Sequence, residues 1–137
     1  MKPTPEFIGA WRRQAESDLR NARRNAEIGA YDVCVLLCQQ AAEKMLKAAY
    51  MAVKGEEAPF THSLAMLQRE LGASVEAIGA AAELTADYIT SRYPPGGSEV
   101  PVDRYDAAAS ADRLERAQRV VEWAQEVLDE ALADGPP

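Results

Sequence analysis

The sequence predicts an all-α protein, an antiparallel up-and-down four-helix bundle with one additional short helix. Three observations lead to this fold class. Apolar residues recur at spacings of three and four over long segments, as one face of an α-helix requires. No segment alternates apolar and polar residues with the period of two that marks a half-buried strand. Glycines and prolines stand between the periodic segments, where they end one helix and allow a turn.

The first two expected helices lie in the N-terminal half. The first begins near Pro5, because proline suits the first turn of a helix, and ends at Gly29. The second runs from about Tyr31 to Lys54 and stops at Gly55. On a helical wheel its apolar residues cover roughly half of the circumference, so it should contact two or more neighbours. These apolar residues are Tyr31, Cys34, Val35, Leu37, Cys38, Ala41, Ala42, Met45, Leu46, Ala48, Ala49 and Val53.

The remaining helices follow a loop over residues 56–61. The segment THSLAMLQREL predicts a short third helix that Thr61 or Ser63 can cap. A fourth helix is expected from about Val75 to Arg92, and the prolines and glycines of RYPPGGSEVP then predict a long loop over residues 93–104. The last helix begins near Asp106. The residues expected to face inward from the fourth helix are Ile78, Ala81, Ala82, Thr85, Tyr88 and Ile89.

The length of 137 residues suits one domain, which we place at residues 5–134, with residues 1–4 and 135–137 as disordered tails. No segment has the ~20 consecutive apolar residues that cross a bilayer, and no signal-like apolar run follows residues 1–5. We therefore expect a cytoplasmic protein that does not bind membranes. Cys34 and Cys38 are the only cysteines, and we interpret them as buried thiols rather than a disulfide or a zinc site.

The charge distribution is uneven. Residues 1–54 carry nine Lys and Arg against six Asp and Glu, whereas residues 55–137 carry six against sixteen. The net charge of -7 does not favour a phosphate backbone, so any nucleic-acid surface must be local. The first helix holds the densest candidate for such a surface, although we favour the interpretation of its arginines as a solvated face. Its arginines are Arg12, Arg13, Arg20, Arg23 and Arg24.

A band of polar side chains follows the second helix opposite its apolar arc. Within this band Glu43 can pair with Lys47 one turn further on. The band either faces solvent, or it presents polar groups to a partner protomer or to the groove between helices. In the second case Gln39 and Gln40 would form hydrogen bonds across an interface. The band consists of Gln39, Gln40, Glu43, Lys44, Lys47 and Lys54.

Common catalytic motifs are absent from the sequence. It contains no Gly-rich phosphate loop, no His-Glu-x-x-His, no Cys pair with metal spacing and no nucleophile elbow. A di-metal helical bundle needs Glu-x-x-His pairs, and the chain has one His. We therefore predict no metal site and no cofactor.

Two polar sites remain as candidates. His62 precedes the third helix, where its ring could act as a base or could simply shape the turn. Arg92 ends the fourth helix, where it either complements the helix dipole or holds a phosphate bidentately. In the latter case Tyr93 would stack on a base or close the pocket. The residues alone leave both alternatives open at each site.

Four segments in a fixed order resemble the HEPN domain, a nucleotide-binding domain of higher eukaryotes and prokaryotes. They are DLRNA, YDVCVLLCQQAAEKMLKAAY, THSLAMLQREL and YITSRYP, and an acidic, proline-containing loop and a long last helix follow them. Each segment alone is a weak signal, and the ordered set is more specific. The resemblance covers about residues 7–132 and is strongest to the prokaryotic branch that contains Arg-Tyr-Pro.

The resemblance implies an up-and-down helical bundle that forms a homodimer. It also implies a partner, a separately encoded minimal nucleotidyltransferase, often in a toxin–antitoxin arrangement. Many HEPN domains are metal-independent ribonucleases with an Arg, four to six arbitrary residues and a His. Here the positions that should hold that His are Gly97, Ser98 and Glu99. The only His, His62, belongs to the HSL segment thirty residues before Arg92.

Three functional interpretations follow. The first is a non-catalytic nucleotide- or RNA-binding and dimerisation module, with Arg92, Tyr93, His62, Lys44 and Lys47 as candidate binding residues. The second is a metal-independent ribonuclease toxin in which Arg92 works with His62 across a dimer. The third is an interaction scaffold without a nucleotide role, which would tolerate the loss of Arg92.

Overall fold

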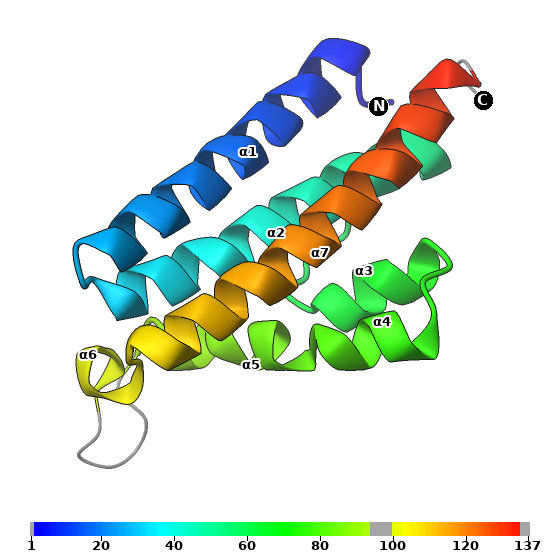
Figure 1. Ribbon diagram of the computed structural model, residues 1–137. Helices are drawn as coiled ribbons and strands as arrows, with labels where there is room; N and C mark the ends of the chain where they lie inside the picture. The colour runs from blue at the N-terminus through cyan, green and yellow to red at the C-terminus, as the bar shows by residue number, and fades with distance from the viewer. Residues whose placement is uncertain (1, 94–99, 135–137) are drawn as a thin grey trace.

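A computed structural model describes residues 2–93 and 100–134 of the chain. Figure 1 shows helices connected by turns and loops, with the long helices lying side by side. The helices are α1 (Pro5–Glu27), α2 (Tyr31–Lys54), α3 (Leu64–Glu70), α4 (Val75–Ala80), α5 (Ala82–Thr90), α6 (Pro101–Arg104) and α7 (Ala107–Ala133). The predicted all-α bundle is confirmed, and no helix within the described residues is long and apolar enough to cross a membrane.

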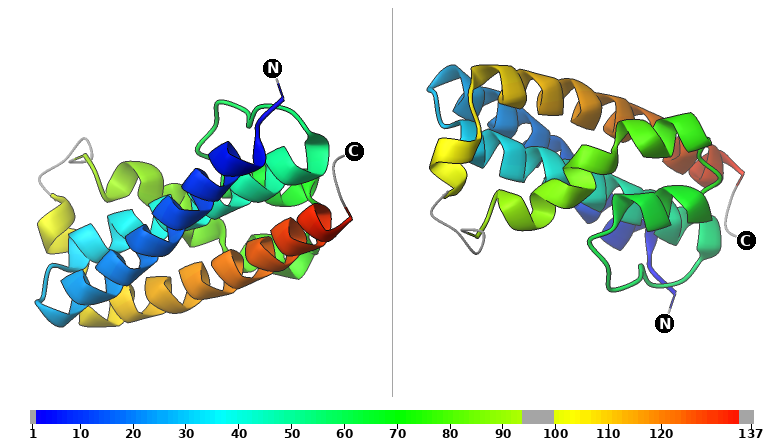
Figure 2. Two further views of the ribbon diagram at one scale, coloured as in Figure 1. Left: turned by 90° about the horizontal axis from the view of Figure 1, so that it is seen from above. Right: turned by 90° about the horizontal axis from the view of Figure 1, so that it is seen from below.

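Helix α2 lies at the centre of the molecule. It packs along α1 on one side and α7 on the other, and it also contacts α3, α5 and α6. Both views of Figure 2 show the short helices α3, α4 and α5 completing the bundle where a fourth long helix would lie. The wide apolar arc predicted for α2 therefore reflects several neighbours. Cys34 and Cys38 are buried free thiols on this arc, as expected.

Local sequence signals explain most helix ends. The side chains of Thr4, Ser63, Ser74 and Asp106 each accept a hydrogen bond from a backbone N–H of the helix that follows. Helix α2 ends at Gly55, which has the left-handed conformation (φ 68°) that glycine adopts without steric cost. The predicted third helix and its cap at Ser63 are therefore confirmed.

The fourth helix is not continuous, because α4 and α5 are separated at Ala81. The N–H of Ala81 bonds to the carbonyl of Ile78, and the N–H of Leu84 bonds to the carbonyl of Ala81, each three residues back instead of four. Side chains from other helices take two carbonyls near this break. Gln68 of α3 donates to the carbonyl of Ala77, and Arg116 of α7 donates to that of Ala80.

The break also changes which side chains face the core. Ile89, predicted to face inward, is exposed, whereas Leu84 and Asp87 are buried. Val53 of α2, predicted on the apolar arc, is 40% exposed. The loop expected from residue 93 to residue 104 contains the helical turn α6, while its residues 94–99 lie outside the described residues, as do residues 1 and 135–137 of the predicted tails.

Candidate nucleotide site

The polar band of α2 is partly buried within one chain, which corrects the interpretation of a solvated band. Gln39, Glu43 and Lys47 are 1%, 6% and 8% exposed. A helical wheel treats α2 as an isolated cylinder, and here the segment before α3 comes close enough for His62 to reach this face. Gln40 and Lys44 are half-buried, and Lys54 is exposed.

Glu43 is the centre of this buried group. The side-chain amide of Gln39 donates to Oε1 of Glu43 at 2.9 Å, and Nζ of Lys47 donates to Oε2 at 3.2 Å. Nδ1 of His62 lies 3.0 Å from Oε1. Gln40 in turn donates to Oε1 of Gln39 at 2.6 Å. Three side chains thus converge on one carboxylate, and the predicted pair of Glu43 with Lys47 is present.

The electrostatics of Glu43 favour its ionised form. Burial raises the pKa of this carboxyl, but hydrogen bonds from Gln39 and His62 and the charge of Lys47 outweigh it, so the pKa lies below its usual value. An ionised carboxylate can only accept hydrogen bonds. Nδ1 of His62 therefore carries the hydrogen that bonds to Glu43, and Nε2 is the remaining nitrogen of a side chain that is 51% exposed.

Arg92 and His62 both lie against the ring of Tyr88. The imidazole of His62 stacks on this ring with centroids 3.7 Å apart and planes 13° from parallel. The guanidinium carbon of Arg92 lies 4.4 Å from the ring centroid of Tyr88. We call these three residues the Tyr88 cluster. The two candidate residues, thirty positions apart in sequence, thus contact the same tyrosine ring within one chain.

One nitrogen of the Arg92 guanidinium lacks a hydrogen-bond partner in the described part of the chain. Its Nε is buried without a hydrogen-bond partner among residues 2–93 and 100–134. Arg12, Arg113, Arg116 and Arg119 by contrast form ion pairs. A planar cation stacked on an aromatic ring is suited to an anion such as phosphate.

The other predicted binding residues lie in different settings. Tyr93 follows Arg92 and is 57% exposed. Lys44 forms an ion pair with Asp18 of α1 at 2.6 Å. Lys47 is buried, and its Nζ also lies 6.0 Å from the ring centroid of Trp11. The ring of Tyr93 is thus open to solvent beside Arg92 in the chain, whereas the two lysines are engaged with other side chains of the bundle.

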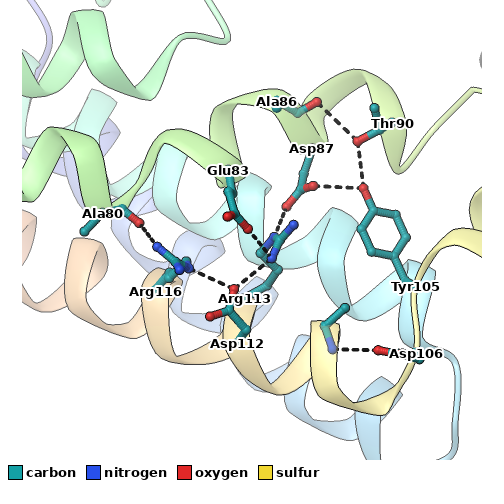
Figure 3. A network of polar contacts seen from close by, with 11 residues as sticks. Ala80, Glu83, Ala86, Asp87, Thr90, Tyr105, Asp106, Asp112, Arg113 and Arg116 are labelled. Carbon is teal, nitrogen blue, oxygen red and sulfur yellow. Dashed lines mark hydrogen bonds and ion pairs between the residues drawn. The ribbon is translucent and has the colours of Figure 1, made fainter.

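A second polar network joins α5, α6 and α7, and sequence inspection did not identify it. Asp87 is buried and accepts from Nε of Arg113 at 2.6 Å and from the hydroxyl of Tyr105 at 2.8 Å (Figure 3). Arg113 also pairs with Glu83 and Asp112, and Thr90 lies 2.7 Å from the Tyr105 hydroxyl. Asp112 of α7 also pairs with Arg116 and is thus part of this network.

The pKa values in this network follow from its contacts. Burial lowers the pKa of Arg113, but the hydrogen bond and the charge of Asp87 outweigh it, so the pKa lies above its usual value. Burial raises the pKa of Tyr105, and Asp87 adds to this effect although Thr90 opposes it. The charged guanidinium and the neutral phenol are both favoured, as structural contacts require. The network fixes α5 and thereby positions Tyr88.

The arginines of α1 do not form one free basic surface. Arg12 pairs with Asp129 of α7 at 2.7 Å, and Arg23 donates to Gln118 of the same helix. Arg13, Arg20 and Arg24 are exposed. Within residues 2–93 and 100–134, no group of three or more His, Cys, Asp and Glu side chains is placed to hold a metal ion.

The fold and the Tyr88 cluster together define a helical-bundle protein in which an arginine side chain and a histidine ring stack on one tyrosine. The sequence matches the model of the HEPN domain over residues 8–132, and the chain belongs to this family. The family resemblance is thereby confirmed. No curated protein was found to match the sequence.

Solved structures agree with this assignment. TT1696 from Thermus thermophilus is 28% identical, with a TM-score of 0.79 over 88% of this chain and 98% of that chain. ST0689, described as an archaeal HEPN homologue, is also 28% identical, with a TM-score of 0.75 over 88% of this chain and 97% of that chain. A HEPN domain protein from Thermotoga maritima has the same fold at 24% identity, with a TM-score of 0.68 over 88% of this chain and 98% of that chain.

Proposed function

We propose that this HEPN domain is a nucleotide- or RNA-binding and dimerisation module. It would work in the cytoplasm with a minimal nucleotidyltransferase in a toxin–antitoxin-like system. One observation carries the binding role: Arg92 and His62 lie against the ring of Tyr88, and Nε of Arg92 has no partner among the described residues. The homodimer and the nucleotidyltransferase partner rest on family membership.

The chemistry of the Tyr88 cluster suits a nucleotide. Arg92 supplies a planar cation for a phosphate, and the half-exposed ring of His62 and the exposed ring of Tyr93 offer surfaces on which a base can stack. The net charge of -7 opposes binding through the whole surface, so a local site has to provide the attraction.

Arg92→Ala tests the binding role. We expect it to weaken binding of a fluorescently labelled, mixed-sequence single-stranded RNA by at least about tenfold, because a charge-assisted pair contributes roughly 1.5–3 kcal/mol. Fluorescence anisotropy measures the affinity, and thermal denaturation checks that the fold is kept. Arg69→Ala removes an equally charged, exposed side chain from α3 and serves as the matched control. Equal affinities of Arg92→Ala and wild type would reject the site.

The double variant Arg13→Ala/Arg20→Ala tests the alternative surface on α1. If this double variant loses RNA binding and Arg92→Ala does not, the arginines of α1 form the nucleic-acid surface instead.

Sedimentation velocity on the wild type tests whether the chain forms a dimer. A chain that remains monomeric at all concentrations would contradict the dimerisation role.

A second candidate function is a metal-independent ribonuclease, and the hydrogen bond between Glu43 and His62 favours it. Glu43 orients the imidazole through Nδ1, which leaves Nε2 available to take a proton from a ribose 2′-hydroxyl. Arg92 beside the same Tyr88 ring would stabilise the charge that develops on the phosphate. His62 and Arg92 contact the same Tyr88 ring within one chain, and we therefore propose this chemistry without a second protomer supplying either side chain.

Cleavage of mixed RNA in EDTA separates the two candidates. If the chain is a ribonuclease, His62→Ala abolishes cleavage while RNA binding decreases by less than about tenfold, because the imidazole moves a proton and adds modest affinity. Arg92→Ala should lose both activities. Glu43→Gln should slow cleavage, since it removes the carboxylate that orients the imidazole. No cleavage by folded wild type, with binding retained, would leave the binding module as the function.

A further inference from the structure

An apolar cavity of about 210 Å³ lies between the start of α1, the end of α2 and the loop that follows α2. Both views of Figure 2 show this loop beside the N-terminal end of α1. Phe7 and Trp11 of α1 line the cavity together with Met51 of α2, and the two aromatic rings meet edge to face with centroids 6.3 Å apart. Sites for drug-sized ligands have roughly 300–1,000 Å³, whereas about 150 Å³ is enough for a benzene ring. The cavity therefore suits one aromatic side chain.

Phe60 lies at the edge of this cavity with its side chain fully exposed. The chain is held in place on both sides of this residue. Ala58 packs against the core, and His62 bonds to Glu43 and stacks on Tyr88. A ring that protrudes from a fixed segment loses little freedom when a partner covers it, so its burial contributes more to association.

The charges at the cavity favour an apolar occupant. Lys47 is the cation among the described lining residues, and its ammonium is already paired with Glu43. Glu57 also lines the cavity, but it is exposed, so water solvates its carboxylate and screens its attraction for a cation. An aromatic ring gains free energy here by the burial of apolar surface on both sides of the contact. Phenylalanine, tryptophan and methionine are also enriched in the cores of protein interfaces.

We infer that two copies of this chain associate through this face, with the ring of Phe60 of each copy inserted beside Phe7, Trp11 and Met51 of the other. The protruding ring and the cavity lie next to each other on one surface. A two-fold axis brings the same surface to both sides of a contact, so a single arrangement fills both cavities. The inference rests on the dimerisation that we propose above and adds the surface that carries it.

Phe60→Ser tests this contact in the full-length chain. We expect sedimentation velocity to give a dimer dissociation constant at least about tenfold higher than that of the wild type, because an aromatic anchor buried in a partner's pocket is a typical hot spot. Ile28→Ser is the matched control. Ile28 is also largely exposed, but it follows the opposite end of α1, so this variant should dimerise like the wild type. Thermal denaturation checks that both variants are folded.

Trp11 reports on the cavity itself. The chain has two tryptophans, so Trp123→Phe leaves Trp11 as the single one. We expect the Trp11 emission to shift to shorter wavelength as this variant is concentrated, because the ring of Phe60 from the other copy replaces water beside the indole. The shift should follow the same concentration range as dimer formation in sedimentation velocity.

The outcomes separate this inference from the proposed dimerisation. A wild type that stays monomeric at all concentrations would overturn both. A dimer that Phe60→Ser leaves as tight as the wild type would overturn the inference alone, and so would a Trp11 emission that stays constant while the dimer forms. Loss of the dimer in Ile28→Ser, with Phe60→Ser unaffected, would place the interface at the other end of α1.

Discussion

Glu43 shows how one residue in a helical bundle can serve two roles. Its carboxylate neutralises Lys47, which would otherwise be a buried charge without a counterion, and it also orients the exposed ring of His62. The first contact stabilises the fold, and the second places an imidazole at the surface. A residue that appears as one polar position in the band of α2 thus links the core to the candidate site.

Glu43→Gln should lower the free energy of unfolding by roughly 1–3 kcal/mol at pH 7, because Lys47 loses its ion pair. The folded pKa of Glu43 lies below the ordinary value of 4.5, so its contribution is present above about pH 4.5 and is lost as the pH falls through the folded pKa. The difference between wild type and variant should therefore shrink in acid. Urea unfolding at pH 7, 5 and 4 measures it.

Glu130→Gln, at an exposed position of α7, is the control for this pH series and should leave stability unchanged at each pH. A difference between wild type and Glu43→Gln that stays constant with pH would show that Glu43 has the same pKa in the folded and unfolded chain.

At the scale of elements, α5 connects the two polar groups of the molecule. Asp87 points to Arg113 and Tyr105 (Figure 3). The next residue, Tyr88, contacts His62 and Arg92. A helix of nine residues is too short to hold its place through its own hydrogen bonds. Its contacts with α2, α3 and α7, together with the hydrogen bond from the Tyr105 hydroxyl, must supply that stability.

Asp87→Ala should reduce the free energy of unfolding by roughly 2–4 kcal/mol, because it leaves the largely buried Arg113 without its buried counterion, although the more exposed Glu83 and Asp112 remain. Tyr105→Phe removes one hydroxyl and should cost about 0.5–1.5 kcal/mol. Chemical denaturation compares both with Asp103→Asn, an exposed control on α6. A loss for Asp87→Ala no larger than for Tyr105→Phe would contradict the anchoring role of Arg113.

The sequence was most informative where a local signal decides the structure. Ser63 begins α3 through a hydrogen bond to its side chain, and Gly55 ends α2 through its left-handed backbone conformation. Both positions were predicted. The break at Ala81 was not predicted, because it involves Gln68 and Arg116, which lie nine and thirty-six positions from the carbonyls they bind. No local pattern contains that information.

For the candidate site, the sequence predicted which residues could take part but not how they are arranged. Arg92 and His62 could be named from their residue types, but their common contact with Tyr88 depends on how α5 packs beside the segment before α3. The burial of Glu43 and Lys47 likewise depends on neighbours that a helical wheel does not include. Residue identity therefore indicated the candidates, and tertiary packing determined their arrangement.

At the scale of the whole molecule, stability should depend most on α2, which contacts every long helix. Leu46→Ala should lower the free energy of unfolding by roughly 2–5 kcal/mol, because Leu46 is completely buried at 0% exposure. Leu132→Ala is the control, since Leu132 of α7 is 46% exposed and should cost less than about 1 kcal/mol. Urea unfolding at neutral pH measures both. Similar losses at the two positions would show that α2 is not the centre of the core.

The arrangement around Glu43 also constrains how this chain can diverge over evolutionary time. A substitution of Glu43 alone would leave the buried ammonium of Lys47 unpaired, so these two positions should change together among descendants of this sequence. His62 is half-exposed and can be replaced without leaving a buried charge behind. Descendants should therefore be able to lose the imidazole at position 62 while they keep the pair of Glu43 with Lys47, and with it the bundle.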